Sequence, residues 1–259
     1  MRQDFNYHTH TWRCGHASGS DEEYIQMAIK AGFRILGFAD HGPYRQYSNP
    51  YSHMEWSQID EYVASLSALR EKYADQISIL IGFETEYYRH MHNEKAQLKQ
   101  KAQYLILGQH YDSPQCAVSY FRPNSEEEIL EYGRLVCEGL ESGLFTYLCH
   151  PDLVMYHQES FTPACRKAAH MIGAKAAETG IPLEVNVHRI AKGKLEYEEG
   201  LRYPYPNREF WEILASYPVR CLFGVDAHSP AQLLDTGAMD EAFREIQDLN
   251  LDFISEPLF

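Results

Sequence analysis

The sequence predicts an α/β fold in one domain over residues 1–259, with a mainly parallel sheet closed into a distorted (β/α)7 TIM-like barrel. Short apolar runs alternate with amphipathic stretches along the whole chain, which is typical of repeated strand and helix units. No shift in composition, low-complexity segment or internal repeat marks a domain boundary. Because seven units are one fewer than a regular barrel contains, a doubly wound open sheet is the alternative.

Seven apolar runs of strand length predict the strands. They cover residues 5–8, 35–39, 77–83, 104–108, 145–149, 182–187 and 221–225. Because these runs alternate regularly with helical stretches, they favour strands of a mainly parallel sheet.

Helical spacing of apolar residues predicts a helix between or after these runs, at residues 20–31, 56–73, 93–100, 125–141, 163–179, 207–216 and 239–249. Two of these segments begin with a capping-box pattern, a serine followed three residues later by glutamate, at residues 20–23 and 125–128. Gly32, Gly143 and Gly180 follow the helical patterns directly, as C-terminal caps do.

Composition narrows the classes of function. The formal net charge is −14 and basic residues form no cluster, which argues against a nucleic-acid surface. No apolar stretch is long enough to span a membrane, and the chain enters its first strand without a signal sequence, so we expect a soluble cytoplasmic protein. The six cysteines form no paired motif and are interpreted as small core residues, at positions Cys14, Cys116, Cys137, Cys149, Cys165 and Cys221.

Two pairs of side chains able to bind metals follow the first and the last predicted strand of the chain. His8 and His10 end the first strand, and Asp226 and His228 follow the last. Residues at i and i+2 of a strand point to the same face, and the first and last strands of a closed barrel are neighbours, so all four side chains would meet. A second His-x-His triplet, at residues 90–92, lies in a polar stretch that is interpreted as a solvated loop.

Polar side chains able to bind metals follow six of the seven predicted strands, at the end where barrel enzymes build their active sites. Seven histidines and two acidic residues are too many ligands for one ion, so two or three ions are expected. Imidazole and carboxylate groups without thiolates suit Zn²⁺, Fe²⁺ or Mn²⁺. The candidate ligands are His8, His10, His16, His41, Glu84, His110, His150, Asp226 and His228.

These motifs resemble the polymerase and histidinol phosphatase (PHP) superfamily of metal-dependent phosphoesterases, and within it the histidinol-phosphatase branch. The resemblance rests on short segments spread over nearly the whole chain. They cover residues 7–11, 14–16, 38–43, 82–87, 107–110, 150–153, 184–186 and 224–229.

The resemblance implies a trinuclear centre in which His8, His10, Glu84 and Asp226 hold one ion, Glu84, His110 and His150 a second, and His16, His41 and His228 the third. It places Asp40, Asp152 and Asn186 behind the ligands, with direct ligation by Asp40 left open. A metal-bridging hydroxide would attack phosphorus, and Asp226 or His228 would protonate the leaving group.

Phosphate recognition points to arginine, whose planar fork matches phosphate oxygens. Arg189 and Arg202 both lie after the sixth predicted strand and are the candidate substrate-binding residues. The loop after His150 lacks the arginine expected in some members of the branch, and His157 is a possible substitute. The remaining histidines, at positions 53, 90, 92, 170 and 188, are interpreted as surface or structural residues.

The resulting prediction is a cytoplasmic phosphomonoesterase of histidine biosynthesis that hydrolyses L-histidinol phosphate. The protein would bind a small phosphorylated substrate, and neither nucleic acid nor a membrane is expected as a partner. The sequence leaves the oligomeric state open. The alternatives are a related phosphoesterase acting on a sugar phosphate, nucleotide or phosphotyrosine, and a non-catalytic metal-binding module.

Overall fold

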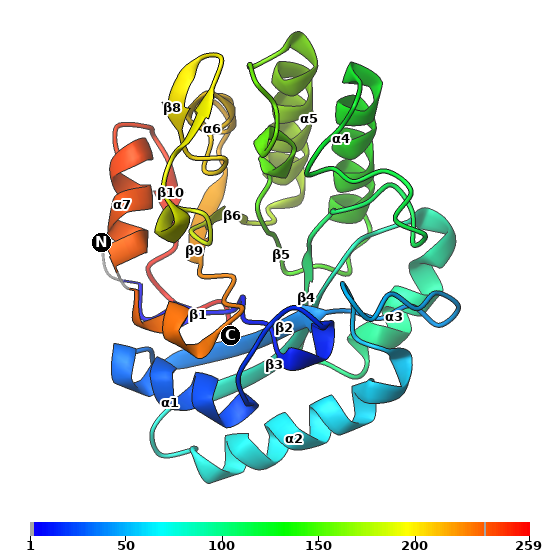
Figure 1. Cartoon of the computed structure of the whole chain (residues 1–259), viewed down its shortest axis with the longest axis vertical. Coiled ribbons are helices and arrows are strands. Elements are labelled where there is room, and N and C mark those ends of the chain that lie inside the picture. The colour runs from blue at the N-terminus through cyan, green and yellow to red at the C-terminus, as the bar shows by residue number, and fades with distance from the viewer. Residues whose placement is uncertain (1–2, 236) are drawn as a thin grey trace.

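The computed structural model describes residues 3–235 and 237–259, which form one curled parallel sheet surrounded by helices (Figure 1). The sheet has the strand order β1-β2-β3-β4-β5-β6-β9-β10. These strands are β1 (Phe5–Asn6), β2 (Ile35–His41), β3 (Ser78–Thr85), β4 (Tyr104–Leu107), β5 (Tyr147–Leu148), β6 (Leu183–Asn186), β9 (Arg220–Gly224) and β10 (Asp252–Phe253). The predicted distorted barrel is confirmed, and all seven predicted strands are present.

The barrel closes between the first and last predicted strands, mainly at their carboxyl ends. Thr9, beyond β1, forms a parallel bridge with Ala227, beyond β9, and the amide of His10 donates to the carbonyl oxygen of Ala227 at 2.9 Å. Nearer the strands, the side chain of Asn6 takes the place of a backbone partner, accepting from the amide of Val225 at 2.9 Å. This closure brings the His8 and Asp226 pairs side by side, as the sequence predicts.

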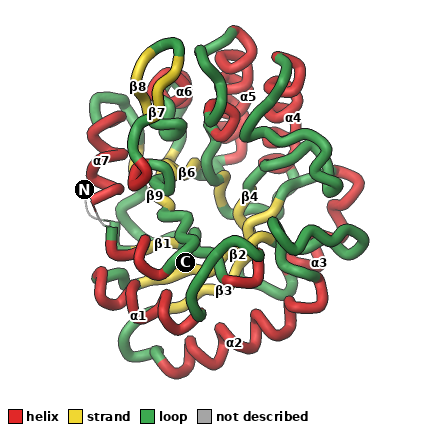
Figure 2. Tube along the Cα trace, in the orientation of Figure 1, coloured by secondary structure: helices red, strands yellow, loops and turns green. Residues whose placement is uncertain are grey.

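Seven helices form the outer layer around the strands in the described part of the chain (Figure 2). Ser20 caps the first helix with the predicted capping box, whereas Ser125 makes only half of one: it accepts from the Glu128 amide, while the Glu128 carboxylate turns to the Asn124 amide. The helices are α1 (Asp21–Ala31), α2 (Ile59–Lys72), α3 (His92–Lys99), α4 (Glu126–Glu141), α5 (Pro163–Thr179), α6 (Arg208–Leu214) and α7 (Gly237–Ile246).

Some features of the fold were not predicted. The strands β7 (Leu195–Tyr197) and β8 (Gly200–Arg202) form an antiparallel hairpin, and β10 adds a short strand beside β9. The second His-x-His triplet is not a loop, because His90 lies in a 3₁₀ turn and His92 begins α3. All six cysteines are free thiols; four are buried as predicted, while Cys116 and Cys137 are only partly buried.

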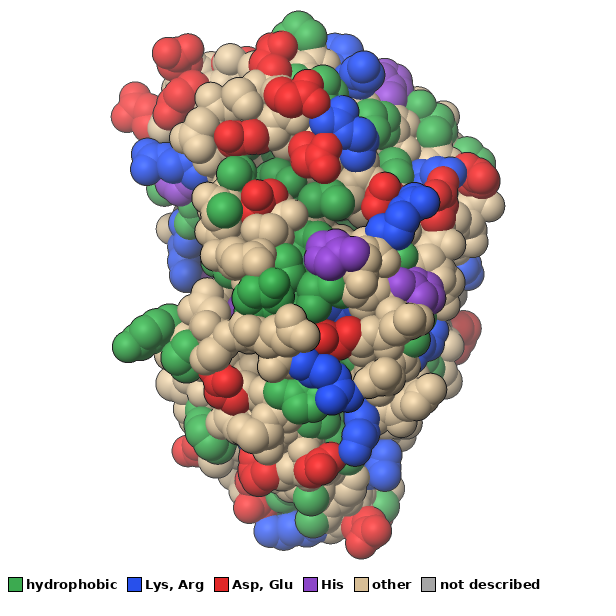
Figure 3. Space-filling model, turned by 90° about the vertical axis from the view of Figure 1, so that its right-hand side faces the viewer, with side chains coloured by type: hydrophobic (Ala, Val, Ile, Leu, Met, Phe, Trp, Pro, Cys, Tyr) green, Lys and Arg blue, Asp and Glu red, His purple; other side chains and the backbone are tan. Residues whose placement is uncertain are grey.

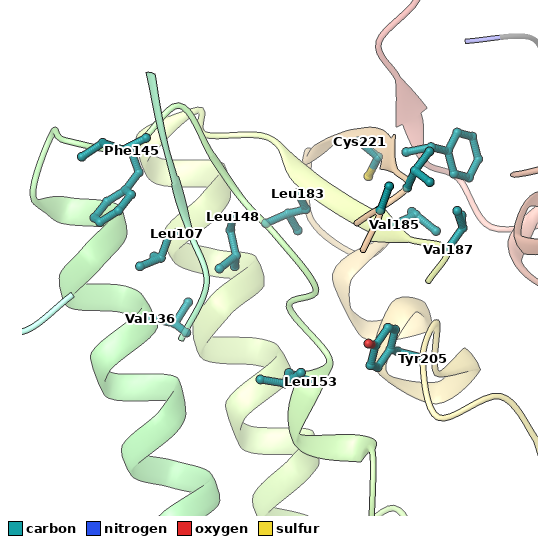
Figure 4. Packing of buried hydrophobic residues seen from close by; sticks show 14 of the residues in the cluster. Leu107, Val136, Phe145, Leu148, Leu153, Leu183, Val185, Val187, Tyr205 and Cys221 are labelled. Atoms are coloured by element: carbon teal, nitrogen blue, oxygen red, sulfur yellow. The ribbon is translucent and has the colours of Figure 1, made fainter. Parts of the chain in front are cut away.

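The apolar core has two layers. Outward-facing strand residues such as Leu107, Leu148 and Leu183 pack against the helices, with Val136 of α4 among their neighbours (Figure 4). A smaller cluster fills the barrel itself, formed by Phe5, Tyr7, Ala39, Tyr104, Ile106, Tyr147, Cys149 and Leu222. All eight side chains of the inner cluster are fully buried, so the polar groups at the carboxyl ends of the strands lie above a packed apolar layer.

The surface carries both signs of charge. On the face shown in Figure 3, acidic, basic and apolar side chains are intermixed. No helix among the described residues has the length and apolar character that crossing a membrane requires.

Candidate metal centre

The nine candidate ligands lie together at the carboxyl ends of the barrel strands. The register of the parallel strands places these ligands at the same height along the barrel axis. Glu84 on β3, for example, is paired with His41 on β2 and with Ile106 on β4. Most of them are buried, but His16 is exposed and His228 is partly exposed. The fold therefore gathers residues that are up to 220 positions apart (8 to 228) around one small volume.

Glu84 is at the middle of the cluster. Its carboxylate passes over Gly108, where a Cβ atom would lie only 2.1 Å from Oε1, so a side chain at position 108 would displace it. The Oε2 atom is 3.4 Å from His8 Nε2, 3.5 Å from His10 Nε2 and 3.2 Å from His41 Nδ1, and the Oε1 atom is 3.1 Å from His110 Nε2 and 2.9 Å from His150 Nε2. Contacts through both oxygens suit a bridging carboxylate.

Asp226 closes the cluster on the side of the last strand. Its Oδ1 atom lies 3.0 Å from His10 Nε2 and 3.5 Å from His8 Nε2. Asp226 has φ +52°, and His150 has φ +30°, in the left-handed region that L residues seldom adopt. Strained backbone of this kind concentrates at functional sites, where the surrounding structure holds it in place.

The three histidines that the resemblance assigns to a third ion form the outer part of the cluster. His228 Nε2 lies 3.1 Å from His16 Nε2, and the His16 ring is 5.2 Å from the His41 ring between centroids. His10, His41 and His228 also each offer a nitrogen within 4.8 Å of the other two. His10 therefore stands between this group and the buried part of the centre.

The donor atoms fit divalent metal ions. Six buried atoms of the candidate ligands make no hydrogen bond in the described part of the chain: His8 Nε2, His10 Nδ1, His10 Nε2, Glu84 Oε2, His150 Nδ1 and Asp226 Oδ1. Other polar atoms nevertheless lie within about 3.5 Å of most of them. Buried polar atoms normally have partners, because leaving one unsatisfied costs about 1–3 kcal/mol. Four of these atoms, His8 Nε2, His10 Nε2, Glu84 Oε2 and Asp226 Oδ1, surround one volume at separations of 3.0–3.5 Å. This arrangement, together with their imidazole and carboxylate chemistry, suits Zn²⁺, Fe²⁺ or Mn²⁺.

The charges of the metal-free cluster point to the same conclusion. Burial disfavours the charged imidazole of His8, but three carboxylates, led by that of Glu184, outweigh it and raise the pKa of His8 to about 10. Burial also opposes charge on His110, where Glu84 raises the pKa to about 10. Despite burial, nearby imidazolium groups hold the pKa of Glu84 and that of Asp226 well below their usual range. Without metal, protons on histidines supply the positive charge that cations would supply.

We therefore expect metal binding to release protons and to strengthen with pH. Because His8 and His110 have pKa values near 10, both carry a proton at pH 7 and must lose it to become ligands. Each displaced proton makes the apparent affinity about tenfold higher per pH unit below that pKa. Calorimetric titration with Zn²⁺ in two buffers of different ionisation enthalpy measures the protons released at pH 7. Equal heats in both buffers would contradict the expectation.

Two buried carboxylates that the sequence analysis did not assign hold the ligands in orientation. Glu184 contacts His8 Nδ1 with both oxygens, at 3.0 and 3.1 Å, so His8 Nε2 faces Glu84. Glu86 contacts His110 Nδ1 at 2.9 Å, so His110 Nε2 also faces Glu84. Such contacts fix the tautomer and ring orientation of metal-binding histidines.

The signals for these two residues were present in the sequence. Glu184 is a charged residue inside an apolar strand and is two positions from Asn186, hence on the same face. Glu86 stands in the same relation to Glu84. A charged side chain in a buried strand needs a specific partner, which is the reason to expect a polar site at each. What the sequence lacked was the identity of the partner.

We expect Glu184→Gln to weaken metal binding by about 10–100-fold while the protein remains folded. The amide keeps the size of the side chain, which Gly224 accommodates because a Cβ there would be 2.0 Å from Glu184 Oε2. It removes the negative charge that orients His8. Competition with a chromophoric zinc chelator measures the affinity, and Glu178→Gln on the exposed surface of α5 serves as the control. Equal affinity in both variants would show that Glu184 is only a core residue.

Of the three residues expected to orient the ligands, Asp40 and Asn186 contact a ligand and Asp152 does not. Asp40 Oδ1 lies 3.5 Å from His10 Nδ1, and Asn186 donates to Asp226 Oδ2 at 3.2 Å, so both contact ligands. The expectation for Asp152 was wrong. Its carboxylate accepts from the Asn207 amide at 2.6 Å and from Trp211 Nε1 at 3.1 Å, and therefore anchors the start of α6.

A cavity of about 510 Å³ opens over the cluster. Its basic residues outside the ligand set are Arg189, Lys192, His157 and His188, and its aromatic wall includes Phe121, Tyr156 and Tyr205. His188, interpreted as structural, thus lines the cavity while its Nδ1 atom lies 2.8 Å from the Asp226 carbonyl oxygen.

The two candidate arginines differ. Arg189 lines the cavity, with its guanidinium 4.9 Å from the centre of the Tyr156 ring. The prediction that Arg202 contacts the substrate is corrected, because Arg202 is not among the residues that line the cavity. Its guanidinium donates instead to the carbonyl oxygens of residues 155, 158, 203 and 204. It joins the β7–β8 hairpin to the loop after β5.

The candidate proton donors are both engaged in the cluster. The low pKa of Asp226 leaves it without a proton at neutral pH. Burial lowers the pKa of His228 well below its usual range, and its Nδ1 atom is 3.0 Å from the Asp226 carbonyl oxygen while Nε2 faces His16. Both arrangements favour ligand roles over proton donation.

Comparison with known proteins agrees with this description. The PHP domain family matches residues 6–188. A Deinococcus radiodurans protein named "Probable histidinol-phosphatase" is 29% identical, covering 93% of this chain and 92% of that protein, and a Schizosaccharomyces pombe protein of the same name is 25% identical, covering 87% and 81%. The Lactococcus lactis histidinol phosphate phosphatase, solved with zinc, L-histidinol and phosphate, superposes with a TM-score of 0.72 at 17% identity, covering 97% of this chain and 95% of that one.

Proposed function

Since the chain belongs to the PHP domain family, we propose that it is a metal-dependent phosphomonoesterase that hydrolyses L-histidinol phosphate to L-histidinol and phosphate. The observation that carries the chemistry is the convergence of unpartnered imidazole and carboxylate atoms on one volume beneath an open cavity. The substrate is supported by the names of the relatives and of the similar solved structure.

In this proposal the nine ligands hold two or three divalent ions, with Glu84 in contact with both buried groups. When bound, the ions supply Lewis-acid chemistry: they neutralise phosphoryl oxygens and lower the pKa of water in the site. Glu184 and Glu86 keep the histidine rings aimed at the centre. Because these groups are fixed before the substrate arrives, they need little reorganisation during the reaction.

The cavity wall suits a phosphate ester with a flat leaving group. The rings of Phe121 and Tyr156 meet edge to face with centroids 5.6 Å apart, and the Phe121 ring stacks on the predicted ligand His110 at 5.7 Å. The imidazole of histidinol could pack against these aromatic faces while its phosphate reaches the ions. Arg189 is on the same cavity and provides a planar fork for phosphate oxygens.

We expect Arg189→Met to lower kcat/KM by about 10–100-fold, because a hydrogen bond to a charged group contributes about 1.5–3 kcal/mol. Arg202→Met is the matched comparison. It should lower the melting temperature, since Arg202 donates to four backbone carbonyl groups, and leave kcat/KM within a few-fold of the parent. Steady-state kinetics with thermal melting separates the two. A larger kinetic loss for Arg202→Met would reverse the assignment.

The proposed function also includes the domain organisation of the chain and its location in the cell. We propose that residues 1–259 form one catalytic unit that takes a small phosphorylated substrate, as the net charge of −14 disfavours long nucleic acids. A role in histidine biosynthesis implies a cytoplasmic location.

The test is phosphate release by metal-reconstituted protein from L-histidinol phosphate, sugar phosphates, nucleotides and phosphotyrosine. We expect kcat/KM for L-histidinol phosphate to exceed the others by about a hundredfold or more, because that ratio measures differential transition-state binding. Even activity across the panel would keep the phosphoesterase and overturn the substrate. No release from any ester would support the non-catalytic metal-binding module.

A further inference from the structure

The thiol of Cys149 lies at the floor of the metal centre. Cys149 follows β5 and is fully buried, on the inward side of the barrel. Its Sγ atom is 3.0 Å from Glu84 Oε1 and 3.3 Å from His150 Nε2. The sequence analysis interpreted this cysteine as a core residue, and no role in the site was assigned to it.

Three donor atoms of different chemistry form a compact triangle here. Its third side, between Glu84 Oε1 and His150 Nε2, is 2.9 Å. Ligands at about 2.0–2.3 Å from a tetrahedral zinc ion lie roughly 3.3–3.7 Å apart. The three atoms observed here are at or somewhat below these separations, so they would need to move apart by only a few tenths of an ångström to share an ion.

A fourth donor completes the group. His8, Glu84, Cys149 and His150 each offer a ligand atom within 4.8 Å of the other three. His8 Nε2 and Glu84 Oε2 are buried and make no hydrogen bond in the described part of the chain, so the group contains donors without a partner. Sulfur, imidazole and carboxylate together resemble the ligand sets that zinc accepts.

We propose that Cys149 supplies a sulfur ligand to the metal ion held by Glu84 and His150. The proposal rests on the metal centre proposed above. On binding, the sulfur–metal bond replaces the donation from the thiol to Glu84, and the thiol proton leaves to solvent. A sulfur ligand favours Zn²⁺, Fe²⁺ or Co²⁺ over Mg²⁺ and Mn²⁺ in this position.

Cys14 is the appropriate control because it is the other buried cysteine near the centre. Its Sγ atom is 4.0 Å from His16 Nε2, and its thiol donates to the Thr11 carbonyl oxygen at 3.2 Å. Cys14 itself belongs to two other groups of possible metal ligands, one with His16 and His228 and one with His10 and Asp40, so the Cys14→Ser variant shows whether a sulfur signal comes from Cys14.

The experiment is titration of metal-free protein with Co²⁺, followed by the near-ultraviolet charge-transfer band that a sulfur–cobalt bond produces. We expect the band in the parent and in Cys14→Ser, and its loss in Cys149→Ser. We also expect the most tightly bound ion, which is the last to be lost on dialysis, to bind at least about tenfold more weakly to Cys149→Ser than to the parent protein. A band that persists in Cys149→Ser, or that is missing in the parent, overturns the proposal.

A second measurement avoids any change at Cys149, in case Cys149→Ser does not fold. Zinc X-ray absorption of the Cys14→Ser protein should contain a sulfur shell at about 2.3 Å, and a spectrum with nitrogen and oxygen shells only overturns the proposal. Phosphate release from the same samples separates the two claims. Hydrolysis of L-histidinol phosphate without a sulfur shell rejects the Cys149 ligand alone, whereas a sulfur shell without hydrolysis of any ester rejects the proposed function alone.

Discussion

Glu84→Gln is expected to lower kcat/KM for L-histidinol phosphate by about 10³-fold or more. Glu84 contacts five of the other eight candidate ligands, through both carboxylate oxygens. An amide of the same shape keeps one oxygen but places an NH₂ group where the second ion would bind. Loss of a single preorganised electrostatic group already costs 10²–10³-fold in other enzymes, and this change disturbs two metal positions.

Metal analysis gives this prediction a second readout. The Glu84→Gln protein should retain fewer ions per chain than the parent after dialysis. The control is Glu71→Gln, the same substitution at an exposed position on α2, which should match the parent in both activity and metal content. Near-normal kinetics in Glu84→Gln would mean that Glu84 does not bridge, and the ligand assignment would have to be revised.

Removal of the metal ions is expected to abolish hydrolysis and to lower the melting temperature by roughly 5–10 °C for each ion lost. A ligand at 100 times its Kd stabilises the folded state by about 2.7 kcal/mol, and one kcal/mol corresponds to about 2–4 °C in a chain of this size. The physical reason is the set of buried donor atoms that have no hydrogen-bond partner in the described chain. Calorimetric melting before and after chelation measures the shift.

Adding metals back tests which ions the site accepts. Zn²⁺ or Fe²⁺ should restore both activity and melting temperature, and Mn²⁺ should do so only at higher concentration, because a sulfur ligand disfavours it. Ca²⁺ should restore neither, because seven of the nine candidate ligands are imidazoles and Ca²⁺ prefers oxygen. Unchanged activity and melting temperature after complete chelation would contradict a metal-dependent function.

The parts of the fold that sequence analysis predicted well are those with short-range physical causes. The α5 helix begins at Pro163 and ends at Thr179 as predicted, because Thr162 and Gly180 cap it from adjacent positions. The side-by-side placement of His8 and His10 follows from the two-residue period of an extended chain. Even there, side-chain choices escape prediction, since Glu128 turns from Ser125 to the Asn124 amide.

The sequence by itself determined which residue types stand at the strand ends, and so the chemistry of the site. Only the tertiary structure decided their partners. Asp152 binds the start of α6 instead of a ligand, and Arg202 donates to carbonyl groups that come in part from residues more than 40 positions away. Conversely, Glu184 and Cys149 reach the centre because neighbouring strands hold them there. Backbone geometry sets the direction of a side chain, but the atoms it meets depend on how distant segments pack.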